Sequence, residues 1–195
     1  MTCRKFIPFL VILAGAFAAS RQAAAQTIQL AGTGSVEYQL VHKFHKISAT
    51  SKALAVRGTV DAGGLKVMAR TQVSTFDSDN SNRDAHMMET VEGEKYPWVV
   101  VRAALPGYKL PVKPGTTKVS VQASVEMHGV AVVHPIDITL ESKDGVHYQA
   151  RFTFSESLTS HKIERPSLLF VAVDDLLTIT GKAEVTAKPN GLAAN

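Results

Sequence analysis

Three chemically versatile residues, Arg83, Asp84 and His86, lie within four positions of one another. These residue types could form an acid–base centre, a metal site or an anion-binding site. Catalysis would also need a nucleophile or a bound water in contact with them. On a helix Arg83 and His86 share a face, whereas Asp84 is turned away from Arg83. We therefore expect a helix cap with polar ties to the fold first, a contact of Arg83 or His86 with the polar end of a ligand second, and a catalytic centre last.

The other patterns that suggest chemistry are weaker. His42 and His45 are three apart, and on a strand that odd spacing sends side chains to opposite faces. His128 and His134 flank a turn, but two ligands do not make a closed metal site. Residues 77–88 resemble a calcium loop but lack the glycine at its sixth position and the glutamate at its twelfth. Without a nucleophile-elbow, phosphate-loop or dinucleotide motif, we predict no metal, no catalytic residue and no cofactor.

The N-terminus has the form of a secretory signal peptide. Arg4 and Lys5 precede an apolar run over residues 6–19, and alanines at positions 23–25 offer a small-residue cleavage site. The run is shorter than the roughly 20 apolar residues that a transmembrane helix needs. We predict that residues 1–25 are a cleaved signal peptide, that the protein is periplasmic, and that the mature chain has no transmembrane segment.

Cleavage changes the charge and the cysteine content. The chain has 21 basic and 17 acidic residues, a net charge of +4. Loss of Arg4, Lys5 and Arg21 leaves 18 basic residues against the same 17 acidic ones, so the net charge falls to +1. So small an excess gives no support to a nucleic-acid partner, and we predict none. Cys3 is the only cysteine; its removal excludes a disulfide framework and a cysteine nucleophile.

Strict alternation of apolar and polar residues is the strongest pattern in the remaining chain. It runs through residues 118–128, 134–142, 146–155 and 177–185. Such alternation is typical of antiparallel strands with one apolar and one solvated face. Less regular runs upstream also indicate strands, with glycine and proline turns between them. Several strands approach ten residues, longer than a small sandwich needs, and closure would leave no open edge. We predict an all-β, lipocalin-like closed antiparallel barrel of about eight strands.

One segment, residues 77–95, shows no alternation. Ser81 and Asp84 match a capping box at the start of a helix. Apolar residues three apart then give the helix one apolar side, made of Ala85, Met88 and Val91 with Met87 beside them. We expect this one short helix to cover an end of the barrel.

Four stretches of the chain occur in the order seen in the YceI-like family. They are "SVEYQLVHKFHK", "RDAHM" followed by Tyr96-Pro97, "VEMHGVAVVHPIDITL" and "LLTITGKAEVTA". The chain resembles this family over roughly residues 34–188, and Arg83–Met87 with Tyr96-Pro97 is the most specific part. The resemblance implies an exported, lipocalin-like barrel that holds a polyisoprenoid lipid in its lumen. It gives a YceI-like lipid-binding domain over residues 26–188. The last residues, 189–195, are predicted from their composition to be a disordered tail.

A barrel of about eight strands is either filled by side chains or holds one small ligand. Burial of a five-carbon isoprene unit contributes very roughly 3 to 4 kcal/mol, whereas association costs on the order of 4 to 15 kcal/mol. Several units are therefore needed, and we predict a long apolar ligand, polyisoprenoid or quinone-like. The predicted lumen residues are Tyr38, Leu40, Val67, Ala69, Val121, Ala123, Val125, Phe152 and Phe154. Candidates for the polar end of the site are His42, Arg83 and His86.

Three functions stay open at this point. The first is an exported, non-catalytic protein that sequesters or carries the lipid. The second is a hydrolase or isomerase that acts on an enclosed apolar substrate through His42 or His86. The third is a ligand-free barrel that acts through its surface. The sequence leaves the identity of the lipid open and is compatible with a homodimer.

Overall fold

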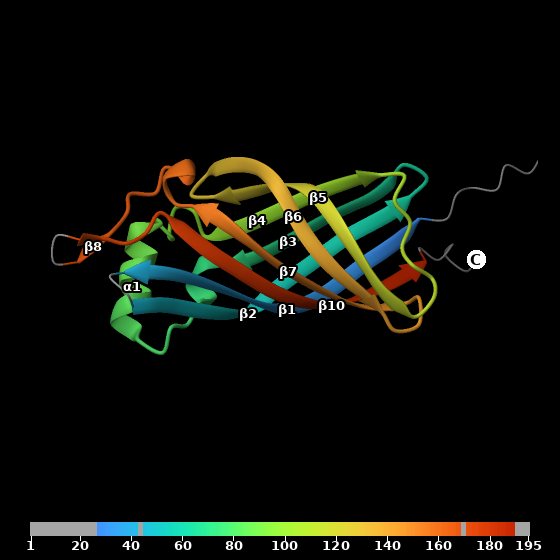
Figure 1. The fold of residues 1–195 in the computed structure, drawn as a ribbon, viewed down its shortest axis with the longest axis horizontal. Coiled ribbons are helices and arrows are strands. Elements are labelled where there is room, and N and C mark those ends of the chain that lie inside the picture. The colour runs from blue at the N-terminus through green and yellow to red at the C-terminus, as the bar shows by residue number, and fades with distance from the viewer. Residues whose placement is uncertain (1–26, 43–44, 169–170, 190–195) are drawn as a thin grey trace, which may run out of the picture.

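The computed structural model describes residues 27–42, 45–168 and 171–189. Eight antiparallel strands close into a barrel in the order β1-β10-β7-β6-β5-β4-β3-β2, and Figure 1 shows them running along the length of the molecule. The predicted all-β closed barrel of about eight strands is therefore confirmed. The predicted signal peptide and residues 190–195 of the predicted tail lie outside the described residues.

The barrel strands are β1 (Ile28–His42), β2 (His45–Asp61), β3 (Gly64–Gln72), β4 (Trp98–Pro106), β5 (Gly115–Met127), β6 (Val130–Ser142), β7 (His147–Ser157) and β10 (Leu176–Pro189). Two short strands, β8 (Ser167–Leu168) and β9 (Val171–Ala172), pair with each other outside the barrel. The described helices are α1 (Ser81–Thr90) and two 3-10 turns, η1 (Val73–Thr75) and η2 (Thr159–His161).

The core occupies the interior of the barrel because the alternating residues of each strand point to opposite sides. Strand β10 shows this most clearly: from Leu177 to Val185 its odd-numbered residues face inward and are buried, whereas the intervening ones are exposed. Leu177, Ile179 and Val185 of this strand join one hydrophobic cluster with residues of the other barrel strands. Each fully buried aliphatic side chain of this kind contributes about 1.5–3 kcal/mol to folding.

Strand β1 approaches β10 so closely that a side chain is excluded at Gly34. A Cβ atom there would overlap the carbonyl of Lys182 on β10. The pairing of β1 with β2 also shifts between Gly34 and Val36, as at a β-bulge. Bulges and glycines increase strand twist and bend, which a closed barrel of long strands requires.

Two segments lie over one end of the barrel. Helix α1 is the first, as predicted, and Figure 1 shows it at the left-hand end of the molecule. The second is the described part of the connection between β7 and β10, residues 158–168 and 171–175, which contains η2, β8 and β9. The sequence did not predict this second cover.

The predicted capping box is wrong by one residue. The N-cap is Asn80, whose extended backbone brings its side-chain oxygen within 3.0 Å of the Arg83 N–H that it accepts. The Asp84 carboxylate instead accepts from the N–H of Ser78, 3.1 Å away and outside the helix. Because the helix begins at Ser81, Asp84 lies one position too far along to close the box, and it ties the preceding loop to the helix instead.

Candidate functional site

The barrel interior contains a cavity of about 190 Å³, which we call the inner cavity. Every barrel strand contributes side chains to its wall. Apart from Arg70, Thr71 and two tyrosines, all of the lining residues are apolar. An enclosed wall of this composition suits a hydrocarbon, because few polar groups must lose their hydration when it is filled.

A second cavity of about 420 Å³, the outer cavity, lies between the end of the barrel, α1 and the β7–β10 connection. Val36, Thr71, Val99 and Ile179 line both cavities, so the two adjoin inside the barrel. The outer cavity also has polar groups in its wall, which the inner one largely lacks. Together they form an apolar interior that ends in a chamber with mixed chemistry.

The predicted site residues divide between the two cavities. The inner cavity is lined by Val67, Ala69, Val121, Ala123, Phe152 and Phe154. The outer cavity is lined by Tyr38, Leu40, His42, Arg83 and His86. Val125 shares the inward face of β5 but is fully buried and lines neither cavity. The role of these residues in ligand binding stays a prediction.

The side of α1 that meets the outer cavity agrees only in part with the predicted one. Arg83, Met87 and Thr90 line the cavity at helical spacing. Of the predicted apolar side, Met87 and Val91 line the cavity. Ala85 does not, because it is exposed, and Met88 packs against Gly93 in the turn after the helix. The cavity wall on this side therefore has a cation beside the predicted apolar groups, one of which is a flexible thioether.

Tyr38 lies where the apolar interior meets this polar wall. Its ring packs on Phe76, with ring centroids 5.3 Å apart. Burial raises the pKa of the Tyr38 hydroxyl, and the negative charge of Asp84 adds to the rise, while the positive charge of Arg83 opposes it. The charges of Arg83 and Asp84 therefore act on Tyr38, a residue of the outer cavity wall.

The two histidines of the outer cavity differ in exposure. His42 is 7% exposed, as its predicted inward orientation requires. His86 stands at the rim, with 70% of its side chain exposed and its Nδ1 3.2 Å from Glu89 Oε2. The predicted polar ties from the helix are made by Asp84. Arg83 and His86 instead present a cation and an imidazole to the cavity, where they could contact the polar end of a ligand.

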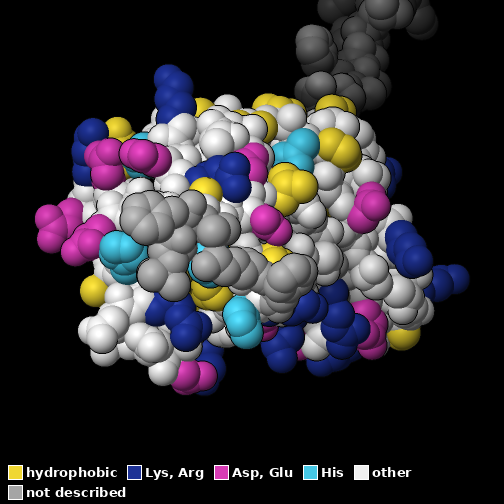
Figure 2. All heavy atoms as spheres, turned by 60° about the vertical axis from the view of Figure 1, so that its left-hand side comes forward, with side chains coloured by type: hydrophobic (Ala, Val, Ile, Leu, Met, Phe, Trp, Pro, Cys, Tyr) yellow, Lys and Arg dark blue, Asp and Glu magenta, His cyan; other side chains and the backbone are white. Residues whose placement is uncertain are grey.

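Figure 2 shows the end of the molecule that α1 covers. Basic, acidic and histidine side chains lie side by side there, with apolar side chains visible between them. Within the described ranges no group of three or more His, Cys, Asp or Glu residues could hold a metal ion. None of the described helices is long and apolar enough to cross a membrane.

Sequence reasoning missed the contribution of the β7–β10 connection to the outer cavity. Leu158, Pro166 and Val173 from this connection line it. One signal was available, because residues 158–175 form a link far longer than the roughly 2–5 residues of a hairpin loop. A connection of that length between neighbouring strands indicates a segment with a role of its own.

The sequence model of the YceI-like domain matches residues 22–185. No functionally curated protein matches the chain. Among solved structures, a polyisoprenoid binding domain from Saccharophagus degradans implicated in plant cell wall breakdown is similar at 12% identity and a TM-score of 0.69, covering 83% of this chain and 98% of that one.

Two further solved structures share the fold. Burkholderia cenocepacia BcnA is 13% identical with a TM-score of 0.63, covering 78% of this chain and 96% of its own. The YceI protein of Campylobacter jejuni is 14% identical with a TM-score of 0.57, covering 76% and 89% respectively. Because the family match extends over most of the sequence and the barrel fold agrees with it, the chain belongs to the YceI-like domain family.

Proposed function

We infer that this protein binds one long apolar chain, of the polyisoprenoid or quinone-like class, and sequesters or carries it without altering it. The observation that carries the proposal is the inner cavity, whose wall is apolar on all eight strands. The similar domain from Saccharophagus degradans is described as polyisoprenoid-binding, which supports the same class of ligand.

The two cavities suit the two ends of such a ligand. Each buried CH₂ contributes about 0.8 kcal/mol, so a chain of several isoprene units exceeds the association cost of about 4 to 15 kcal/mol. The apolar tail would occupy the inner cavity, and the polar end would lie in the outer cavity near Arg83 and His86.

Export is part of the proposal. The pattern of residues 1–25 supports a cleaved signal peptide, and residues 26–188 would then be the exported lipid-binding domain. A carrier of this kind would shield the hydrocarbon from water in the periplasm.

Native mass spectrometry and solvent extraction of the exported protein test the proposal. We expect the wild type to yield an extractable apolar mass. Ala103→Phe should abolish it because Ala103 lines the inner cavity, whereas Ala104→Phe should retain it because Ala104 is exposed on the outer face. Circular dichroism would confirm that both variants fold. An apolar mass absent from the wild type, or equal in all three proteins, would refute the proposal.

A further inference from the structure

The hydrogen-bonded ladder between β6 and β7 stops before either strand ends. Its last pair towards the α1 end is Asp137↔Thr153. Beyond that pair, residues 130–136 of β6 remain paired with β5, and residues 154–157 of β7 remain paired with β10. The two stretches lack a ladder with each other, and we call the space between them the β6–β7 seam.

The sequence and the neighbouring turn explain why the ladder ends there. Pro135 has no N–H to donate, and prolines in strands lie where a ladder partner is absent. At the end of β6, the carbonyl of Val130 is bound by a side chain instead of a strand: Nδ1 of His161, from η2, lies 2.9 Å from it. The Val130 carbonyl at this edge of β6 is thus satisfied without pairing to β7.

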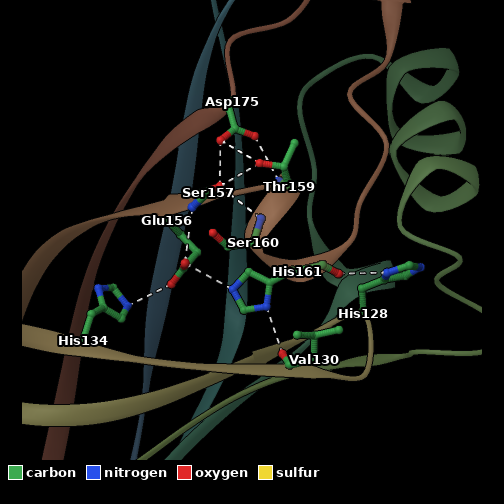
Figure 3. Close-up of polar contacts among 9 residues, drawn as sticks. All are labelled: His128, Val130, His134, Glu156, Ser157, Thr159, Ser160, His161 and Asp175. Atoms are coloured by element: carbon green, nitrogen blue, oxygen red, sulfur yellow. Dashed lines mark hydrogen bonds and ion pairs between the residues drawn. The ribbon is translucent and has the colours of Figure 1, made fainter.

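Glu156 of β7 bridges the seam through two histidines (Figure 3). Its Oε2 lies 2.8 Å from Nε2 of His134 on β6, and its Oε1 lies 3.2 Å from Nε2 of His161. Glu156 is 4% exposed and His161 is fully buried. Both ring nitrogens of His161 face oxygen atoms, so a cationic ring suits its surroundings when Glu156 is ionised.

These bridging contacts are ionic and not well-aligned hydrogen bonds. Neither Nε2 atom nor Glu156 Oε2 makes a hydrogen bond of good geometry within the described part of the chain. A β-ladder is directional and must be broken pair by pair, whereas an ion pair depends mainly on distance. The seam is therefore closed by side-chain contacts that separate without disturbing any backbone pairing.

The closure is connected to both covers of the outer cavity. His128, in the turn between β5 and β6, has Nδ1 3.1 Å from the His161 carbonyl and Nε2 3.2 Å from Oε1 of Glu92, which follows α1. Asp175, before β10, accepts hydrogen bonds from the Ser157 hydroxyl at 2.6 Å and the Thr159 N–H at 2.9 Å. Movement at the seam would therefore reach the turn after α1 and the β7–β10 connection.

The bridge separates the lumen from the outside. The Phe154 ring, which lines the inner cavity, lies edge-on to His134 with centroids 5.4 Å apart. Leu158, two residues after Glu156, lines the outer cavity. His134 itself keeps 22% of its side chain exposed to solvent. His134 therefore lies between solvent and the Phe154 ring on the wall of the inner cavity.

The shortest ladder between neighbouring strands of the described barrel, β4–β5, is sealed differently. Strands β4 and β5 pair only from Val100↔Glu126 to Ala103↔Ala123. Residues 107–114 cover the remainder, because Tyr108 and Leu110 line the inner cavity. The carbonyl of Pro111 in this segment also accepts a hydrogen bond from the Tyr148 hydroxyl at 3.0 Å. The gap between β4 and β5 is thus covered by a segment of the chain, whereas the β6–β7 seam is bridged by the ion pairs of Glu156 with His134 and His161.

We propose that the apolar ligand enters and leaves the lumen through the β6–β7 seam, and that Glu156 with His134 and His161 is the latch that holds the seam shut. The inference rests on the proposed function. A long chain could pass sideways through such an opening without removal of α1 or of the β7–β10 connection from the end of the barrel.

A covalent lock on the seam tests the route. Cys3 is the only native cysteine and lies in the predicted signal peptide, so Pro135→Cys/Ser155→Cys would carry the only thiols of the mature protein. The two positions face each other when the register is extended by two residues past Asp137↔Thr153. A bis-maleimide bridges them, and mass spectrometry verifies the link. The matched control, Thr139→Cys/Arg151→Cys, bridges a pair that is already in the ladder.

The probe is farnesol carrying a dansyl group, loaded before cross-linking and released into excess phosphatidylcholine vesicles. We expect the seam lock to slow release of the probe at least roughly tenfold, and the control lock to change the release rate by no more than about twofold. The affinity for the probe should stay the same in both. Equal release from both locked proteins would overturn the route.

Weakening the latch should have the opposite effect. Glu156→Gln removes the bridging charge, and we expect it to accelerate probe uptake and release by a similar factor with affinity nearly unchanged. The control Glu141→Gln breaks an exposed ion pair with Arg151, 3.6 Å long, which joins the same two strands inside the ladder. Unchanged rates in Glu156→Gln would overturn the latch.

If wild type binds no probe, the proposed function fails and the route with it; normal binding with an ineffective lock removes the route alone.

Discussion

The ring of Phe152 lies against the backbone of Gly181 on the neighbouring strand, in space that a side chain at position 181 would need. The two residues are ladder partners in β7 and β10, and both lie on inward-facing positions of their strands. A Cβ atom on Gly181 would overlap the Phe152 ring. Because Phe152 lines the inner cavity, this glycine keeps the ring against the wall and leaves the lumen open.

Gly181→Ala should therefore reduce ligand binding by filling the lumen from its own wall. We expect the displaced ring to enter the inner cavity, to lower the affinity for an apolar probe roughly tenfold, and to destabilise the fold by about 1–3 kcal/mol through overpacking. Probe titration and urea denaturation measure the two effects. Combining Gly181→Ala with Phe152→Leu should restore much of the affinity and of the stability, because the shorter leucine side chain leaves room for the Cβ atom at position 181. An unchanged affinity in Gly181→Ala would show that the ring yields in another direction.

The N-terminus of α1 gives a prediction that separates two adjacent residues. Asn80→Ala removes the oxygen that accepts the Arg83 N–H, and we expect a loss of about 0.5–2 kcal/mol, as for other N-cap residues. Amide exchange at Arg83, followed by nuclear magnetic resonance, should accelerate in the same variant. Ser81→Ala should change the stability by less than about 0.5 kcal/mol. A larger loss of stability in Ser81→Ala than in Asn80→Ala would instead support the capping box expected from the sequence.

The barrel was predictable because the pattern that specifies each strand can be seen within a short stretch of the sequence. Period-two alternation, as in β10, fixes which residues face inward, and strand length together with the need to hide edges favours closure. The same alternation placed Ala123 and Phe154 on the cavity wall and His42 towards the interior. Alternation alone shows that Val125 points inward, but it does not show whether an inward side chain lines a cavity or packs against other side chains. That outcome depends on packing across the barrel.

The features that were missed depend on contacts between distant residues. His134 and Glu156 belong to strands that sequence reasoning did predict, yet their meeting depends on where the β6–β7 ladder stops. His128 and His134, which flank one turn, do not form a site with each other: one contacts Glu92 and the other contacts Glu156. The one-residue error at the helix cap has a local cause, since Asn80 and Ser81 are both good N-caps and only the backbone decides between them.

The Glu156–His161 pair shifts both groups towards their charged forms. Burial raises the pKa of Glu156, but the contact with His161 and the positive charges of His134 and His161 outweigh it, so this pKa lies below its usual 4.5. Burial lowers the pKa of His161, but Glu156 and the Val130 carbonyl outweigh it, so this pKa lies above its usual 6.5. The histidine's contribution to stability is full below pH 6.5 and is lost as the pH rises through the folded pKa of His161. The carboxylate's contribution is full above pH 4.5 and is lost as the pH falls through the folded pKa of Glu156.

The stability difference between wild type and Glu156→Gln should therefore pass through a maximum with pH. We expect the loss in unfolding free energy, roughly 3 kcal/mol when one partner of a buried pair is removed, to be largest between pH 4.5 and 6.5 and smaller on either side. Urea denaturation of both proteins over a pH series measures it. His128, Glu92 and Asp175 are present in both proteins, so to first order their titration cancels. Glu141→Gln, which breaks only an exposed pair, should lose little at any pH. A loss in Glu156→Gln that does not vary with pH would mean that shape, and not charge, holds the seam closed.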